Sequence, residues 1–302
     1  MLEALKFLKN NLYAKTTKVI DNYQSVNHSF DGCVTAIDGG ACIIADGGSW
    51  VVSKLRTANV HYDKGLRVPS MESRKDYYYT VIKKSASYEH SFKDLGVDFG
   101  NIRELTEIPA VVMKYLEFVH AAKTVNDLPS GSLLLIDGLL LGETKDQVKA
   151  LAVLEARAKE RGINVVGVAK SFRHSINGQS VIGLLIKERP TSKWFYSPVQ
   201  DSDCFVARLH ERAKYAYAIN SFKHTNLDEV MPVLAYYSND PEIIGYPYPL
   251  LKVDRDARIS GYEKKLEVNK LRILSKKEGM DFIEYDEKST SMHALMDSQK
   301  YR

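Results

Sequence analysis

Cysteine is scarce in this chain, and no two cysteines are spaced as a metal or redox pair. Only three of the 302 residues are cysteine, at positions 33, 42 and 204, and none lie in a Cys-x-x-Cys pattern. An odd number without paired spacing argues against a disulfide framework and against a zinc ribbon. The composition therefore predicts a reducing, intracellular setting, and we expect a cytoplasmic protein.

Long hydrophobic runs are also missing. No stretch of about 18 apolar residues occurs, so no transmembrane helix and no membrane partner are expected. Residues 1–18 instead carry leucines at positions 2, 5, 8 and 12 with lysines between them, which is the spacing of an amphipathic helix rather than of a signal peptide. We expect residues 1–30 to form this helix and its lead-in, packed on its own domain or offered to a partner.

The charge balance is only mildly basic. The chain has 42 Lys and Arg against 38 Asp and Glu, a net charge of +4. This balance is compatible with a polyanionic partner without indicating one. At 34.1 kDa with 44% hydrophobic residues, the chain can bury a substantial globular core.

Two short segments place an aspartate at the end of an apolar run, directly before glycine. They are Ala36-Ile37-Asp38-Gly39-Gly40 and Leu134-Leu135-Ile136-Asp137-Gly138. A continuously apolar strand is expected inside a sheet, so an Asp at its end is held rigidly and exposed to a ligand. Either segment alone is better explained by the Asp-Gly preference of tight turns; the two together, with the residues that follow, favour a metal site.

The first part of the chain predicts antiparallel strands. We expect residues 32–37 and 41–46 to form a hairpin around Gly39-Gly40, with a third strand from about Ser49 to Val60. The polar stretch 64–101 is interpreted as an extension of the sheet beside a loop. Its tyrosines at 77–79 lie among lysines and arginines, and such interleaving can also bind nucleotide bases and phosphates.

A helix is predicted from Pro109 to about Val125, because apolar residues recur there at helical spacing and Pro109 suits the first turn. Glu117 borders the apolar stripe of this helix and needs a partner. A salt bridge and metal ligation are both open for Glu117. Glu104, Glu107 and Glu143 are rivals for the role of helix ligand.

The chain then alternates between strand and helix. Strand 132–137, helix 143–161 and strand 163–169 predict a β-α-β unit with parallel strands. Further strands are expected at 180–187, 203–209 and 214–221, with a helical stretch at 226–237. A long helix is expected from Leu250 past Leu271, and the tail 286–302 is too polar to order itself unaided.

Acidic residues fall on successive elements of this layout. Asp38 lies on the first strand, Glu117 on the first crossover helix, Asp137 on a parallel strand and Asp254 on the late helix. We interpret the order as an α/β fold with a ribonuclease H-like core, formed by residues 31–285, that brings the four carboxylates around two divalent ions. Clustered carboxylates about 4 Å apart repel by several kcal/mol at an effective dielectric near 20, so cations must neutralise them.

The oxygen ligands suit Mg²⁺ or Mn²⁺. Two such ions would activate water for attack on a phosphodiester and stabilise the leaving oxygen. Lys170 ends the neighbouring parallel strand, Val165-Val166-Gly167-Val168-Ala169-Lys170, and could hold the scissile phosphate. A solvated lysine at a strand end explains its position equally well.

The chain resembles the NurA family of nucleases. The matching segments are the two Asp-Gly strands, Leu116-Glu117, Gly167-Val168-Ala169-Lys170-Ser171, and Gly245-Tyr246-Pro247-Tyr248-Pro249-Leu250 with the following Asp254. The resemblance implies a manganese- or magnesium-dependent DNase with single-strand endonuclease and 5′ to 3′ exonuclease activity in DNA end resection and repair. It also implies a homodimer working with the hexameric ATPase HerA. Members of the family can carry His where this chain has Asp254.

Two other classes of function remain open. The chain could be a non-catalytic adaptor that couples a hexameric motor to DNA ends, although an adaptor gains nothing from retaining mutually repelling carboxylates. An actin-like phosphotransferase also carries Asp-Gly turns, but the late part of the chain lacks a Gly-rich adenosine-binding segment.

Overall fold

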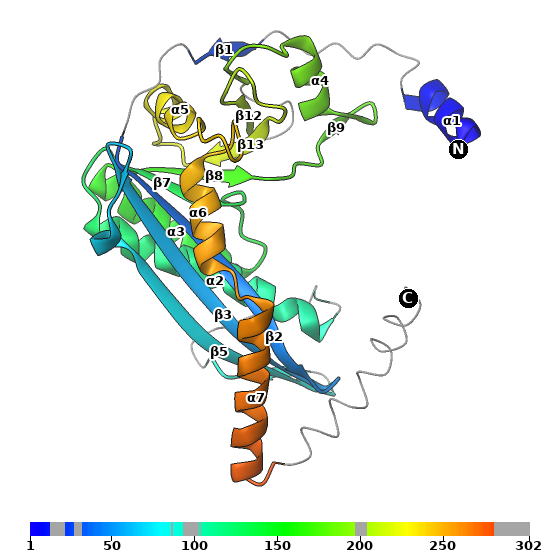
Figure 1. The fold of residues 1–302 in the computed structure, drawn as a ribbon, viewed down its shortest axis with the longest axis vertical. Coiled ribbons are helices and arrows are strands. Elements are labelled where there is room, and N and C mark those ends of the chain that lie inside the picture. The colour runs from blue at the N-terminus through cyan, green and yellow to red at the C-terminus, as the bar shows by residue number, and fades with distance from the viewer. Residues whose placement is uncertain are drawn as a thin grey trace.

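The structure is a computed structural model that describes residues 1–12, 22–26, 32–85, 87–92, 102, 104–196 and 204–280. Its described residues form a mixed α/β fold around one large mixed sheet, with helices on both faces (Figure 1). The strands are β1 (Tyr23–Ser25), β2 (Val34–Asp46), β3 (Trp50–Asp63), β4 (Leu66–Arg67), β5 (Ser73–Lys84), β6 (Ser87–His90), β7 (Leu133–Asp137), β8 (Asn164–Ala169), β9 (Ser175–Ile176), β10 (Gln179–Ser180), β11 (Trp194–Tyr196), β12 (Phe205–Arg208) and β13 (Tyr217–Ser221). The α-helices are α1 (Leu2–Leu12), α2 (Ile108–Thr124), α3 (Lys145–Arg161), α4 (Val181–Glu188), α5 (Leu227–Tyr236), α6 (Tyr248–Ala257) and α7 (Gly261–Lys277).

The large sheet has the strand order β1-β11-β12-β13-β8-β7-β2-β3-β5-β6, and β4 pairs with β3. Strands β2, β7 and β8 are mutually parallel, whereas β13 runs antiparallel to β8. The predicted β-α-β unit is confirmed, because α3 connects the parallel strands β7 and β8. Thr144 caps the start of α3 by accepting a hydrogen bond from the Gln147 amide, and Gly162 ends it in the left-handed conformation, at φ 66°.

The predicted hairpin around Gly39-Gly40 is wrong. β2 continues through both glycines from Val34 to Asp46 and pairs with β3 along its length. The chain turns only after Asp46, where Gly48 takes a φ of 78°. The three antiparallel strands are therefore β2, β3 and β5, and the third comes from the polar stretch that was expected to extend the sheet.

Two further expectations about the later part of the chain are also wrong. Residues 180–187 form helix α4 rather than a strand, with Ser180 capping it and Val181 and Leu185 buried one turn apart. A short apolar run fits either structure, and the buried i, i+4 pair shows which one packs here. The long late helix is two helices, because Ser260 starts α7 by accepting a hydrogen bond from the Glu263 amide. The polar tail 286–302 lies outside the described residues.

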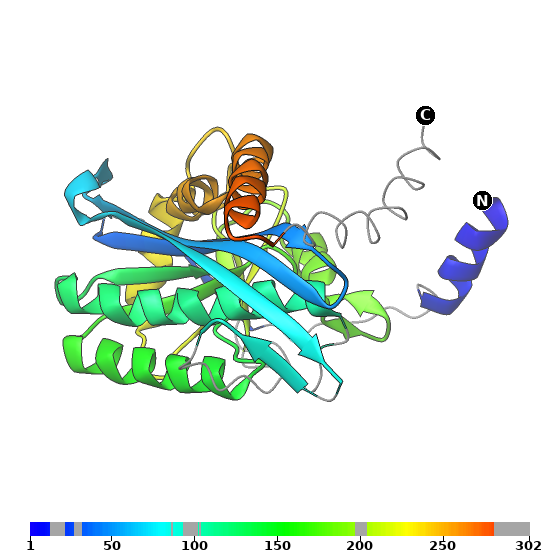
Figure 2. The same cartoon turned by 90° about the horizontal axis from the view of Figure 1, so that it is seen from below.

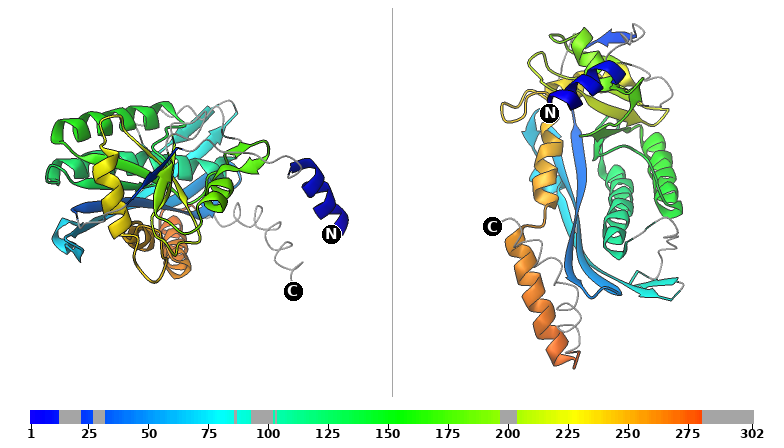
Figure 3. Two further views of the ribbon diagram at one scale, coloured as in Figure 1. Left: turned by 90° about the horizontal axis from the view of Figure 1, so that it is seen from above. Right: turned by 90° about the vertical axis from the view of Figure 1, so that its right-hand side faces the viewer.

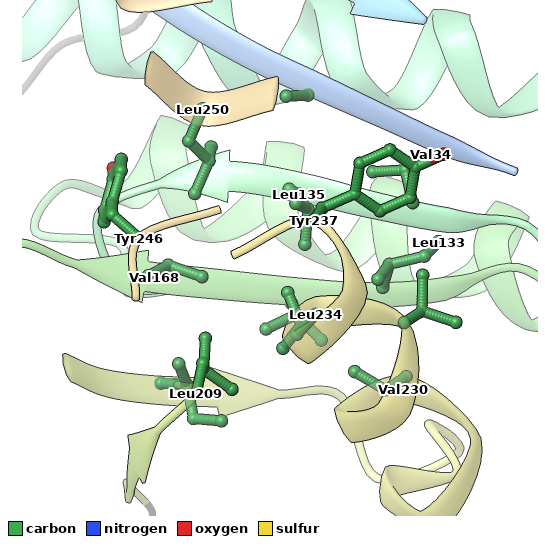
Figure 4. Packing of buried hydrophobic residues seen from close by; sticks show 14 of the residues in the cluster. Val34, Leu133, Leu135, Val168, Leu209, Val230, Leu234, Tyr237, Tyr246 and Leu250 are labelled. Atoms are coloured by element: carbon green, nitrogen blue, oxygen red, sulfur yellow. The ribbon is translucent and has the colours of Figure 1, made fainter. Parts of the chain in front are cut away.

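Helices cover the two faces of the sheet as separate layers (Figures 2 and 3). Helices α2 and α3 pack on one face, against a cluster that includes Ile37, Leu134 and Ile136. Helices α5 and α6 pack on the other face, and Figure 4 shows Leu234 and Leu250 there. Alternate residues of β2 and β7 thus face opposite helical layers, so that side chains from both layers can meet where these strands end.

The N-terminal helix α1 lies apart from the sheet (Figure 3). The side chains of residues 1–7 are exposed. Within the described ranges, no helix is long and apolar enough to cross a membrane.

Candidate metal centre

The parallel pairing of β2 with β7 places two aspartates side by side. Ile37 of β2 is in register with Ile136 of β7, so Asp38 and Asp137 come next on neighbouring strands. β7 ends at Asp137, and Gly138 then turns away with a φ of 89°, while β2 continues. The end of β7 therefore leaves space beside Asp38 in the middle of a long, rigid strand.

The two glycines after Asp38 allow helices to approach β2 closely from opposite sides. A Cβ atom on Gly39 would lie 2.2 Å from the sulfur of Met113 and 2.9 Å from Glu117 Oε1, both on α2. A Cβ atom on Gly40 would lie 2.3 Å from the carbonyl oxygen of Ala257 on α6. Glycine is therefore required at these positions for close packing and not for a turn.

Helix α6 brings a third carboxylate to the pair. Asp38, Asp137 and Asp254 each offer an oxygen, and these oxygens all lie within 4.8 Å of one another. Among the residues that the structure describes, these three aspartates are the one group of three or more Asp, Glu, His or Cys side chains close enough to hold a metal ion. The three carboxylates come from three elements far apart in the sequence.

Glu117 approaches the same place from α2 and is 2% exposed. Its Oε2 lies 2.7 Å from Lys114 Nζ, so the salt bridge considered for Glu117 is present. Burial and the charge of Asp137 nevertheless raise its pKa, despite the lowering by Lys114. Glu117 thus stands beside the three aspartates as a fourth carboxylate without being part of their closest group.

The pKa of Asp38 is raised well above the usual range of a carboxyl group. Burial is the main cause that raises its pKa to about 8, and the charges of Asp137 and Glu117 add to the rise. The Gly39 amide donates a hydrogen bond to Asp38 Oδ1 over 2.8 Å, which partly offsets the effect. The surroundings of Asp38 therefore disfavour its charged form at neutral pH.

Lys170 follows β8 and lies between two of the aspartates. Its Nζ donates hydrogen bonds to Asp137 Oδ2 over 2.6 Å and to Asp254 Oδ1 over 2.7 Å. Burial lowers the pKa of Lys170, but these two carboxylates outweigh burial and raise it. Arg258 also binds Asp254, over 2.8 Å, so that burial of Asp254 is outweighed and its pKa is lowered.

Besides Arg258, two residues beside the carboxylates were missed by the sequence reasoning. Lys114 joins Glu117 to the end of β7, because its Nζ also donates to the carbonyl oxygen of Asp137 over 2.6 Å. Its spacing of three residues from Glu117 on one helix is the signal that could have found it. Tyr246 lies in the Gly-Tyr-Pro-Tyr-Pro-Leu segment, and the charges of Asp137 and Asp38 add to burial in raising its pKa.

The rival acidic residues are not part of the group of three aspartates. Glu104 and Glu107 precede α2, ten or more residues before Glu117. Ten residues of helix span about 15 Å, which keeps both away from the aspartates. Glu143 borders a cavity of about 500 Å³ beside the site, which Lys114 and Lys170 also line.

The donor set fits a hard divalent cation. It consists of carboxylate oxygens from rigid elements, which is the ligand type of Mg²⁺ and Mn²⁺. Lys170 supplies one positive charge at the position between Asp137 and Asp254, while Asp38 makes no ion pair with it. Asp38, Asp137 and Asp254 could therefore hold a cation, with Glu117 adjacent.

Comparison with known proteins identifies the family and the fold. The family model described as NurA domain matches residues 27–259. The crystal structure of the NurA nuclease from Sulfolobus solfataricus is similar in fold, with a TM-score of 0.61, 17% identity, and coverage of 92% of this chain and 95% of that chain. No curated protein matches the chain in sequence.

More remote likenesses are to endonuclease V. The catalytic domain of the human protein has a TM-score of 0.41 and 16% identity, covering 92% of this chain and 96% of that chain. The Ciona intestinalis protein, crystallised with a 24mer DNA containing inosine, has a TM-score of 0.41 and 14% identity, covering 90% and 100%. These scores are too low to carry a functional argument. The family match spans most of the chain, and we conclude that this protein is a nuclease that belongs to the NurA family.

Proposed function

We propose that this nuclease hydrolyses DNA phosphodiesters with two divalent cations, Mn²⁺ or Mg²⁺, held by Asp38, Glu117, Asp137 and Asp254. The observation that carries the proposal is the group of three aspartates whose oxygens lie within 4.8 Å of one another. The raised pKa of Asp38 supports it, because a carboxylate whose ionisation is opposed by burial and by like charges is stabilised in its charged form by a bound cation. When bound, such cations supply water activation at neutral pH and charge stabilisation of the leaving oxygen.

The core of the fold is proposed to be ribonuclease H-like. Three antiparallel strands, β2, β3 and β5, are followed by helix α2 and the parallel strand β7, which supports this assignment. We propose that this core and its flanking elements form a nuclease domain over residues 31–285, preceded by the amphipathic helix and followed by a tail at 286–302.

Within the site, Lys170 and Arg258 have the charge to hold a phosphate. Lys170 is 47% exposed and Arg258 is 70% exposed, so both can contact a polymer arriving from solvent. Their bonds to Asp137 and Asp254 supply the counter-charge that cations would otherwise supply. Once cations compensate the carboxylates, the ammonium group of Lys170 is available for the scissile phosphate.

The elements around the carboxylates also hold these side chains in fixed positions. Asp38 is fixed in the middle of β2, and the Lys114 bond to the Asp137 carbonyl ties α2 to the end of β7. A rigid frame holds the attacking and leaving oxygens in line without a reorganisation cost during the reaction.

The substrate and the partner are proposed from family membership. We propose single-strand endonuclease and 5′ to 3′ exonuclease activity on DNA ends in resection and repair, by a homodimer that works with a HerA-type hexameric ATPase. Helix α1 offers an apolar face for that partner, since Leu2 and Leu5, one turn apart, are 66% and 57% exposed.

A cleavage assay tests this function. Single-stranded DNA and RNA of one sequence, labelled at the 5′ or the 3′ end, are incubated with wild type and Asp137→Asn in Mn²⁺, Mg²⁺ or EDTA. We expect metal-dependent DNA cleavage by wild type, loss in Asp137→Asn, and an order of products that shows the polarity. Cleavage that persists in EDTA or in Asp137→Asn would overturn the metal mechanism, and HerA binding without any cleavage would favour the adaptor.

A further inference from the structure

A second feature lies directly beside the carboxylates and has no part in the mechanism above. It is a cavity of about 650 Å³ whose wall includes Asp254 and Lys170. The segment after β8, helix α4, the start of β13 and the loop before α6 enclose the rest of the cavity. A volume of this size is typical of a site for a small organic group.

Aromatic and aliphatic side chains line this cavity. Phe172, Tyr215, Tyr217 and Tyr246 contribute rings, and Ile182 and Ile243 contribute aliphatic surface. Tyr215 is 65% exposed, so a face of its ring is free to be covered. Stacking on such rings is how proteins hold an unpaired nucleobase, and it tolerates any base.

The polar groups of the cavity lie on the side of the carboxylates. Lys170 and Arg258 carry positive charge there and bind Asp254. A ligand in the cavity would therefore have its apolar part among the rings and an anionic part close to the proposed metal ligands. A nucleotide has this distribution of charge, whereas a lipid tail or an apolar peptide does not.

Tyr246 connects the cavity to the carboxylates and carries an unsatisfied group. The residue is 4% exposed, and its hydroxyl is buried without a hydrogen-bond partner in the described part of the chain. Its ring packs edge-on against Tyr217, with the centroids 5.1 Å apart. A buried hydroxyl without a partner is costly, and a ligand with polar edges can supply one.

A paired base cannot enter such a cavity, because both its faces are stacked and its edge is occupied in a duplex. We propose that the cavity binds the unpaired base of the nucleotide next to the scissile phosphate, with Tyr215 as the stacking platform. This proposal rests on the proposed DNA cleavage at the carboxylates. It implies that the enzyme selects single-stranded or frayed DNA through the base and not only through the backbone.

The test measures binding in EDTA, so that it does not depend on cleavage. Thymidine 5′-monophosphate and deoxyribose 5-phosphate are titrated against the full chain, with dissociation constants from saturation-transfer NMR. Wild type should bind the nucleotide more tightly than the sugar phosphate. Tyr215→Ala should weaken nucleotide binding about 5- to 100-fold, without changing sugar-phosphate binding.

Two variants serve as controls. Tyr215→Phe keeps the ring and should bind the nucleotide like wild type. Tyr262→Ala removes a tyrosine of similar exposure, 73%, from helix α7 and should also bind like wild type. Equal binding of the two ligands by wild type, or unchanged nucleotide binding by Tyr215→Ala, would overturn the proposal.

A cleavage arm separates this proposal from the proposed function. Single-stranded DNA with one abasic residue is digested in Mn²⁺, and we expect the cut next to that residue to be lost. Equal cutting with and without the base would overturn the base site while leaving the nuclease mechanism intact. Base-dependent binding by a wild type that cuts no DNA would overturn the mechanism and leave the base site standing.

Discussion

Two clusters of charged side chains flank the middle of the sheet, and they differ in whether every carboxylate has a cationic partner. In the first, Lys54 and Arg56 of β3 are buried and bind three acidic residues, Asp76, Glu263 and Glu267. In the second, the four carboxylates of the metal centre face Lys114, Lys170 and Arg258, and Asp38 forms no ion pair with another residue that the structure describes. The first cluster joins α7 to the sheet, and the second joins α2 and α6 to the end of β7.

The pKa values express this difference. Hydrogen bonds from Arg56 are the main cause that lowers the pKa of Asp76 and of Glu263 to about 2. Burial and like charges instead raise the pKa of Asp38 to about 8. In the cluster around Arg56, ion pairs stabilise the charged form of Asp76 and Glu263. In the metal centre, the charged form of Asp38 is disfavoured, as expected of a site that binds cations.

The largest effect is expected from Asp38→Asn. This change removes a proposed metal ligand, so cleavage of single-stranded DNA should fall by about 10³-fold or more. The unfolding free energy of the metal-free protein should stay the same or rise, because a repelled charge is lost. Cleavage rates and urea unfolding in EDTA measure the two effects. Unchanged cleavage in a folded variant would contradict the assignment of Asp38.

The reverse pattern is expected from Arg56→Met. The guanidinium group is 1% exposed, whereas Asp76 and Glu263 are 34% and 24% exposed, so that solvent screens part of the loss. We expect about 2–4 kcal/mol of destabilisation by urea unfolding, with cleavage retained at low temperature. Lys84→Met, which breaks an exposed pair with Glu89, should cost less than about 1 kcal/mol. Equal losses of unfolding free energy in the two variants would show that the buried cluster contributes no more to stability than an exposed ion pair.

A smaller effect is expected from Gly39→Ala. The added methyl group would lie 2.2 Å from Met113 Sδ and 2.9 Å from Glu117 Oε1, so that both side chains must move and the Glu117 carboxylate is displaced. Mn²⁺ affinity, measured by calorimetry, should fall about tenfold. Gly183→Ala is the matched control, because its nearest contact is an ordinary 3.6 Å to Ser180 Cβ. If both variants bind Mn²⁺ like wild type, close approach of α2 is not needed for the site.

The smallest effect concerns pH. Because folding raises the pKa of Asp38, the folded state binds its proton more tightly than the unfolded state does. The resulting stability is fully present below the unfolded value near 4 and is lost as pH rises towards 8. The melting temperature of the metal-free protein should therefore decrease between pH 6 and pH 8, and less so in Asp38→Asn.

Metal binding should also displace the proton from Asp38, which tests the raised pKa independently of stability. Binding of Mn²⁺ at pH 7 should release roughly one proton, detected by calorimetry in buffers of different ionisation enthalpy. Release should be close to zero at pH 9, where Asp38 is already charged. Equal proton release by wild type and Asp38→Asn would assign the proton to another group.

The sequence predicted the regular elements well where patterns were long. Helices α2, α3 and α5 and the parallel strands β7 and β8 lie within about two residues of their expected limits. It failed at α4, where a six-residue apolar run fits a strand and a helix equally, and at the break between α6 and α7, where Ser260 starts a new helix. A short apolar run fits both a strand and a helix, so a local pattern predicts the element only when the run is too long for one of the two.

The Asp-Gly-Gly segment shows what sequence alone cannot supply. Its composition is that of a turn, yet Asp38, Gly39 and Gly40 lie inside a thirteen-residue strand. The reason is in the partners, because Met113 and Ala257 occupy the space that side chains would need. No local signal could reveal that both neighbours come from helices more than 70 residues away.

What the sequence determined by itself is the chemistry available: aspartates on apolar strands, a glutamate on a helix and a lysine after the next strand. Their residue types and order required nothing beyond the chain. Only the tertiary structure decided which of them meet and how each is charged. The register of β2 with β7 and the packing of α6 bring Asp38, Asp137 and Asp254 together, and burial at their meeting point raises the pKa of Asp38. Repulsion and desolvation depend on distance and surroundings, which exist only once the chain has folded.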